Sequence, residues 1–177
     1  MKKFIWVALA VSFFSVSSYA QQLGPRGDIS AGYSFLRVGG TGGANLNGFN
    51  TSFAYNANDW FGIAGDVGVY HASPSGVSVT GFTYTFGPRF TYRKSDHVMP
   101  FGEALFGASH ASAAGAGFSG SGNPFTYMLG GGAELPLGSS HSWALRPEAD
   151  YVGLRANGAT SNCVRISVGI VYHIGQK

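Results

Sequence analysis

The segment VRISVGIVYHI, residues 164–174, alternates between apolar and mainly polar positions along its whole length. Successive side chains of a β-strand point to opposite faces, so this pattern predicts a strand with one apolar face. The apolar face carries Val164, Ile166, Val168, Ile170, Tyr172 and Ile174, and the other face carries Arg165, Ser167, Gly169, Val171 and His173.

Similar alternation recurs along almost the whole chain, and no segment has a convincing helical period. Most of these segments exceed the roughly five or six residues of an average strand and suit a tilted membrane strand of about 9–11 residues. Eight strands are predicted, at about residues 28–38, 47–56, 60–71, 77–93, 98–110, 124–136, 142–155 and 162–175.

The first 20 residues, MKKFIWVALAVSFFSVSSYA, have the three parts of a secretory signal peptide. Their apolar stretch is shorter than the roughly 20 residues that a membrane-spanning helix needs. We therefore expect cleavage after Ala20, which leaves residues 21–177 as one exported domain. Cleavage removes two of the 11 Lys and Arg residues and none of the eight Asp and Glu residues, so the net charge falls to +1.

The composition is unusual for a soluble domain. Charged residues make up 11% of the chain, against about 25% in typical soluble domains, while aromatic residues reach 15% and glycine occupies 28 of 177 positions. An exported chain of this kind, without a helical span, indicates a membrane β-barrel. No basic stripe is present, so binding to nucleic acid is not predicted. Cys163 is the single cysteine, which excludes a disulfide within the chain.

The predicted connections alternate between two kinds. The first, third, fifth and seventh are Gly-rich and mostly longer, whereas the second, fourth and sixth are compact and polar. Outer-membrane barrels have short periplasmic turns and longer outer loops. The sequence therefore predicts an all-β fold, an eight-stranded antiparallel up-and-down transmembrane β-barrel. Both ends of the chain are expected in the periplasm, and residues 111–123 form the longest outer loop and the candidate contact surface.

The final strand, the segment LRPEADY at residues 145–151 and the segment MLGGGAELPL at residues 128–137 resemble the small outer-membrane β-barrels of the OmpA/OmpX type. The resemblance covers about residues 28–175. It implies a monomer in the cell outer membrane, in contact with outer-membrane lipid and lipopolysaccharide, and inserted by the barrel-assembly machinery. Many such barrels end on an aromatic residue that this machinery reads. Here the last aromatic residue is Tyr172, so that signal is displaced from the C-terminus toward earlier residues of the sequence.

The segment LRPEADYVGLR, residues 145–155, places its charged residues on one face of a strand. Arg or Lys on the lipid face at the membrane midplane costs about 2–4 kcal/mol, and Asp or Glu somewhat less. These charged side chains are therefore expected to point into the lumen, and the same argument applies to other strands. The predicted lumenal charges are Asp66, Arg89, Glu103, Glu134, Arg146, Glu148, Asp150 and Arg165.

Hairpin symmetry proposes partners for most of these charges. Glu134 lies opposite Arg146, Arg89 opposite Glu103, and Asp150 opposite Arg165, whereas Glu148 has no obvious partner. An eight-stranded barrel is just wide enough for its side chains to fill, and buried charges need partners. We expect these pairs to plug the lumen in place of an open channel.

Aromatic residues gather near the predicted strand ends. Tyr and Trp at such positions form girdles at the two membrane–water interfaces. The predicted interfacial residues are Tyr33, Tyr55, Trp60, Tyr127, Trp143 and Tyr172.

Three other functions stay open: a narrow pore, a lipid-modifying barrel enzyme and a soluble periplasmic lipocalin-like binding barrel. His110 and Ser112 resemble the H-x-S part of the lipid A 3-O-deacylase motif, but Ala113 replaces the asparagine of that motif. No Asp or Glu between Glu103 and Glu134 could orient the histidine. The five histidines also lack the spacing of a metal site. We therefore expect no catalytic residue, no metal and no cofactor, and a protein that is not an enzyme.

Overall fold

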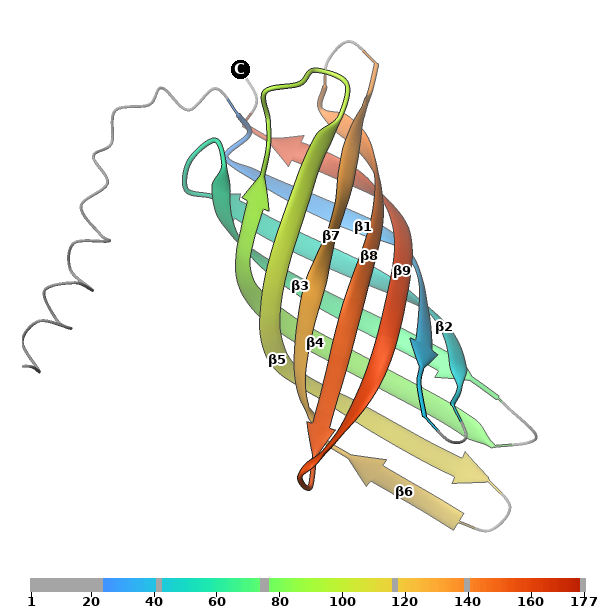
Figure 1. The fold of residues 1–177 in the computed structure, drawn as a ribbon. Helices are drawn as coiled ribbons and strands as arrows, with labels where there is room; N and C mark the ends of the chain where they lie inside the picture. Colours follow the sequence, from blue (N-terminus) through green and yellow to red (C-terminus); the bar gives the residue numbers. More distant parts are fainter. Residues whose placement is uncertain (1–23, 41–42, 74–76, 116–117, 139–140, 176–177) are drawn as a thin grey trace, which may run out of the picture.

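The fold is a closed, strongly tilted β-barrel without helices in the part of the chain that the structure describes (Figure 1). The computed structural model describes residues 24–40, 43–73, 77–115, 118–138 and 141–175, and the predicted signal peptide lies outside these ranges. The strands are β1 (Gly27–Val38), β2 (Asn45–Asn56), β3 (Phe61–Ala72), β4 (Ser78–Thr91), β5 (Met99–Gly115), β6 (Phe118–Gly122), β7 (Phe125–Leu137), β8 (Trp143–Ala156) and β9 (Ala159–Ile174).

Eight of these strands form the barrel wall. Their order is β4-β3-β2-β1-β9-β8-β7-β5, and pairing between β4 and β5 closes the ring. All neighbours are antiparallel, including β1 and β9, which join the two ends of the chain. Closure leaves no open edge in the wall, so every strand can satisfy its backbone hydrogen bonds inside a membrane. The prediction of an eight-stranded up-and-down barrel is confirmed.

The prediction for the Gly-rich outer connections was wrong in two places, because strands continue where loops were expected. β5 runs on to Gly115 and pairs there with β6, which lies within the predicted loop at residues 111–123. β9 begins at Ala159, after a tight turn in which Asn157 and Gly158 have φ angles of 51° and 81°. Two positive φ angles in an Asn-Gly pair are typical of a type I′ hairpin turn. These extensions lack strong alternation of apolar residues, so only their backbone pairing reveals them.

The outward face of the barrel is strongly apolar. Large side chains on it are 38–71% exposed, among them Phe49 at 71% and Ile166 at 57%. The described residues include no helix that is long and apolar enough to span a membrane. An apolar outward face is typical of a barrel wall that contacts the hydrocarbon core of a membrane. The alternative of a soluble binding barrel is therefore wrong.

The two ends of the barrel differ. The turns at residues 57–60 and 92–98 lie at the end of the barrel where β1 begins and β9 ends, which we call the terminal end (Figure 1). The β5–β6 and β8–β9 hairpins lie at the opposite end, which we call the loop end. The β8–β9 turn at the loop end is as tight as any turn at the terminal end. The expectation that both chain ends face the periplasm therefore stays a prediction.

Candidate functional site in the barrel lumen

Charged side chains gather inside the barrel. Six of the chain's eight Asp and Glu residues are buried, each at most 6% exposed, together with three arginines. All eight lumenal charges that the sequence predicts lie there. The buried charges are Asp28, Asp66, Glu103, Glu134, Glu148, Asp150, Arg89, Arg146 and Arg165.

One group of these charges lies toward the terminal end. Arg146 Nη2 donates to Asp28 Oδ1 at 2.7 Å and to Glu134 Oε1 at 2.5 Å. Arg89 Nε donates to Glu103 Oε2 at 2.6 Å, and Arg89 Nη1 lies 3.3 Å from Asp28 Oδ1. Asp28 therefore accepts from two arginines of different strands, which ties β1 to β4 and β8 across the lumen.

Phe101 lies between the two arginines of this group. The guanidinium carbons of Arg89 and Arg146 lie 4.9 and 5.2 Å from the centroid of its ring. An aromatic face attracts cations, and more strongly where water is excluded. Phe101 thus stabilises two like charges that share one carboxylate.

A second group surrounds Arg165, on β9. Its guanidinium donates to Asp66 Oδ1 at 2.7 Å, to Asp150 Oδ2 at 2.8 Å, and to Glu148 Oε1. Glu148, which lacked a partner in the sequence analysis, therefore binds Arg165. Asp66 belongs to β3, which is not a neighbour of β9, so this contact crosses the lumen.

The three hairpin pairs proposed from sequence symmetry occupy the expected positions. Cα registers place Arg89 opposite Glu103 and Asp150 opposite Arg165. Glu134 binds Arg146 on the adjacent strand. Hairpin geometry sets these pairs because both partners belong to strands joined by one short turn.

Two lumenal residues were not included in the predicted charge network, although the alternation had placed His173 on the polar face of the last strand. Asp28 is fully buried, and the His173 ring lies with its Nε2 atom 3.6 Å from Glu134 Oε2. Both positions have the parity of the lumenal face, which the alternation in residues 27–36 and 164–174 could have revealed. Their partners belong to distant strands, so their contacts were not readable from a hairpin.

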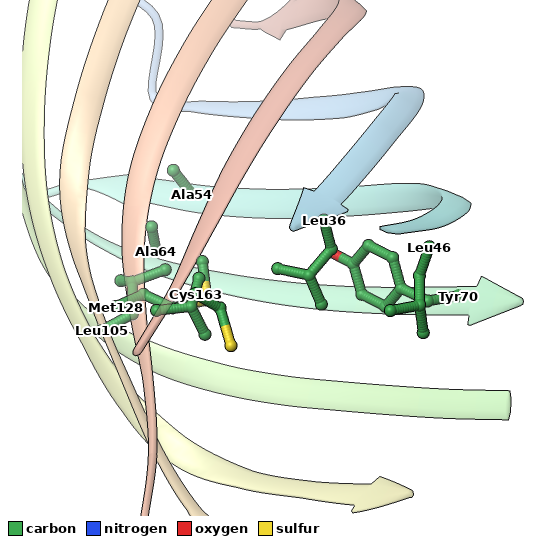
Figure 2. Packing of buried hydrophobic residues seen from close by; sticks show 9 residues of the cluster. Leu36, Leu46, Ala54, Ala64, Tyr70, Leu105, Met128 and Cys163 are labelled. Carbon is green, nitrogen blue, oxygen red and sulfur yellow. The ribbon is translucent and has the colours of Figure 1, made fainter. Parts of the chain in front are cut away.

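An apolar layer fills the lumen next to the charged groups. Leu105, Met128, Val152 and Cys163 lie on adjacent strands in one row, one row closer to the loop end than Glu103 and Arg165. Figure 2 shows Leu36, Leu46 and Tyr70 beside one another and Leu105, Met128 and Cys163 as a second group. The prediction of a purely polar plug was therefore incomplete, because apolar and charged side chains share the inward parity.

The predicted interfacial aromatics lie on the outward face. Trp143 and Tyr172 pack together near the terminal end, with ring centroids 4.8 Å apart. Tyr127 packs against Tyr151 toward the loop end at 6.0 Å. Tyr33, Tyr55, Trp60, Trp143 and Tyr172 are 43–60% exposed, and Tyr127 is partly buried.

The candidate catalytic pair does not assemble into a triad in the described residues. His110 Nδ1 lies 2.7 Å from Asn123 Oδ1, and Ser112 lies opposite Thr80 on β4. No carboxylate of the described residues hydrogen-bonds to His110. A histidine that activates a serine as general base needs such a carboxylate to hold its tautomer and orientation.

A cavity of about 630 Å³ opens at the terminal end. Trp60, Met99 and Pro136 contribute apolar walls, and Arg93 reaches into it. Arg93 donates to Asp59 O and Asn56 Oδ1, both at 3.0 Å. Burial lowers the pKa of Arg93 from its ordinary value, although Glu134 and Asp28 act in the opposite direction.

Comparisons with known proteins agree with this geometry. The family model "Outer membrane protein beta-barrel domain" matches residues 6–173. The structure of Neisserial surface protein A aligns with a TM-score of 0.71 and 14% identity, covering 84% of this chain and 97% of that one. Ail, the attachment invasion locus protein of Yersinia pestis, aligns at 0.61 and 21%, covering 84% and 98%. A comparison with curated protein sequences found no significant match.

A third similar structure is the N-terminal barrel domain of Pseudomonas aeruginosa OprF, with a TM-score of 0.56 and 15% identity over 84% of this chain and 99% of that one. The closed antiparallel wall, apolar outside and charged inside, defines a transmembrane β-barrel of the bacterial outer membrane. The chain belongs to the outer membrane protein β-barrel domain family, and its location is the cell outer membrane.

Proposed function

We propose that this protein is a non-conducting barrel that has a structural or surface-contact role in the outer membrane. The observation that carries the proposal is the filled lumen. Arg89, Arg165 and Glu134 are at most 1% exposed, and the apolar layer, with Leu105 fully buried, lies directly beside them. Ions would have to displace both a charged network and a buried apolar layer to pass, which disfavours the narrow-pore alternative.

Conductance measurements test this proposal. Mature protein, folded in detergent, is inserted into a planar lipid bilayer and recorded in 1 M KCl, with a known porin as the positive control. We expect no stable conductance steps above the bare bilayer. Reproducible long-lived steps would refute the plug and favour a pore.

The loop end is the proposed contact surface. Ser119, Gly120 and Gly122 of β6 are exposed, and the hairpin projects beyond the wall (Figure 1). One solved structure of Ail contains a heparin analogue, sucrose octasulfate, so a protein of similar fold binds a ligand of the polyanion class.

We infer that this chain contacts lipopolysaccharide and outer-membrane lipid through its outward face and is inserted as a monomer by the barrel-assembly machinery. Sedimentation in detergent tests the monomer, since a dimer mass would contradict it.

We also infer that the protein is not a lipid-modifying enzyme. The support is the contact between His110 and Asn123, which occupies the ring nitrogen that a triad carboxylate would need. Mass analysis of lipid A from cells with and without the protein tests this inference. A deacylated species that appears only with the protein, and disappears in a Ser112→Ala variant, would overturn it.

A further inference from the structure

The buried charges of the described lumen do not balance. Six carboxylates meet three arginines, and Arg93 at the mouth adds a fourth positive charge that interacts with Glu134 and Asp28. If all six carboxylates are ionised and His173 is neutral, six negative and four positive charges leave an excess of two negative charges. An uncompensated buried charge is very costly, so either a bound cation or protonation of carboxyl groups must compensate this excess.

The excess is concentrated where Glu103, Glu148 and Asp150 converge. One oxygen from each of these three side chains lies within 4.8 Å of the others, and all three residues are buried. Their nearest cations are already shared: Arg165 also binds Asp66, and Arg89 also binds Asp28. We call Glu103, Glu148 and Asp150 the carboxylate trio.

The trio contains oxygens that the protein leaves without a partner. Glu103 Oε1 and Asp150 Oδ1 have no hydrogen bond within the described residues, although their side chains are only 1% and 0% exposed. Buried polar atoms are almost always paired. Two such oxygens, one on β5 and one on β8, indicate that a ligand supplies the missing interaction.

The strand between those that carry the trio has glycines at the facing positions. Cα registers place Gly130 of β7 between Glu103 on β5 and Asp150 on β8, and Gly132 opposite Glu148. A Cβ atom at Gly130 would lie 2.1 Å from Asp150 Oδ1. The absence of a side chain at this position is therefore what lets carboxylates from β5 and β8 approach each other.

We propose that the carboxylate trio binds one divalent cation of the Ca²⁺ or Mg²⁺ class inside the lumen. Such ions prefer carboxylate oxygens, and two positive charges match the excess. The ion would join β5 to β8 across β7, where Gly130 contributes no side chain. This inference goes beyond the proposed function, because a plug could be neutralised without a metal ion.

Direct binding to the folded mature barrel tests the proposal. The protein is refolded in detergent with a chelator and then transferred into metal-free buffer. Ca²⁺ or Mg²⁺ is titrated into the protein and the heat of binding is measured by calorimetry. Elemental analysis of the protein then identifies the bound ion. We expect one ion per barrel. Glu103→Gln and Asp150→Asn should each weaken binding at least tenfold, whereas the control Asp96→Asn, an exposed carboxylate outside the lumen, should bind like the wild type. Heat-modifiable gel mobility verifies that each variant is folded. If Glu103→Gln does not fold, Asp150→Asn alone tests the contribution of the trio to binding.

Two results would overturn the proposal. One is a folded wild-type barrel that binds neither ion, with infrared bands of protonated carboxyl groups at neutral pH, since protons would then balance the charge. The other is an equal loss of binding in Asp96→Asn, which would place the ion outside the lumen. Neither result changes the expected absence of conductance, so failure here is distinguishable from failure of the proposed function.

Discussion

Replacement of Arg165 by methionine should destabilise the barrel more than any single change on its surface. Arg165 is 1% exposed, and its guanidinium binds Asp66, Glu148 and Asp150. Methionine is unbranched and uncharged and fills much of the same volume, so the change removes the guanidinium and keeps most of the packing of the aliphatic part. Three buried carboxylates would then lack their shared cation.

The expected magnitude follows from these contacts. Removal of one partner from a buried ion pair costs about 3–5 kcal/mol, because the remaining charge stays buried without compensation. Here one arginine serves three carboxylates, so we expect a loss at the upper end of that range, about 5 kcal/mol. Arg165→Lys keeps one charge but cannot reach all three carboxylates, and it should lie between methionine and the wild type.

Urea titration of protein folded in lipid vesicles measures the effect, with tryptophan fluorescence and heat-modifiable mobility as independent probes. The control is Arg37→Met, since Arg37 is exposed and bonds only to Asn45 at 3.3 Å among the described contacts. Exposed substitutions of this kind change stability by about 0.5 kcal/mol or less. A loss below about 1 kcal/mol for Arg165→Met would refute the view that the network holds the barrel together.

Three further outcomes are expected. Gly153→Ala should lower the free energy of unfolding in urea by about 1–3 kcal/mol, because the new Cβ would lie 2.1 Å from the Tyr127 ring. Gly120→Ala, with open space around it, should leave the stability unchanged. Equal effects of the two changes would contradict this packing. Val168→Arg, on the lipid face, should cost about 2–4 kcal/mol in vesicles, and no measurable loss would mean that this face does not contact lipid. Cys163, 1% exposed in the apolar layer, should resist a bulky maleimide until the barrel unfolds, and rapid labelling of the folded state would show an open lumen.

Much of this site is predictable from local sequence. The position of Arg146, Glu148 and Asp150 in residues 145–155 follows from alternation alone, because lipid rejects charge at each position whatever its partner. The same holds for the pairs within a hairpin, such as Arg89 with Glu103, because the turn sets the register. The β5–β6 extension was missed because its small residues carry no apolar period, although their backbone still pairs.

The sequence by itself thus determined which side chains face the lumen and which face lipid, since the surrounding medium acts on every strand separately. Only closure of the barrel decided which lumenal charges meet. Arg146 reaches Asp28 and Arg165 reaches Asp66 from strands that are not neighbours, 118 and 99 residues away in the chain. These contacts depend on the curvature and tilt of the whole ring, as does the approach of three carboxylates over Gly130. No short-range pattern in the sequence carries that information, because the distances across a lumen are set by all eight strands together.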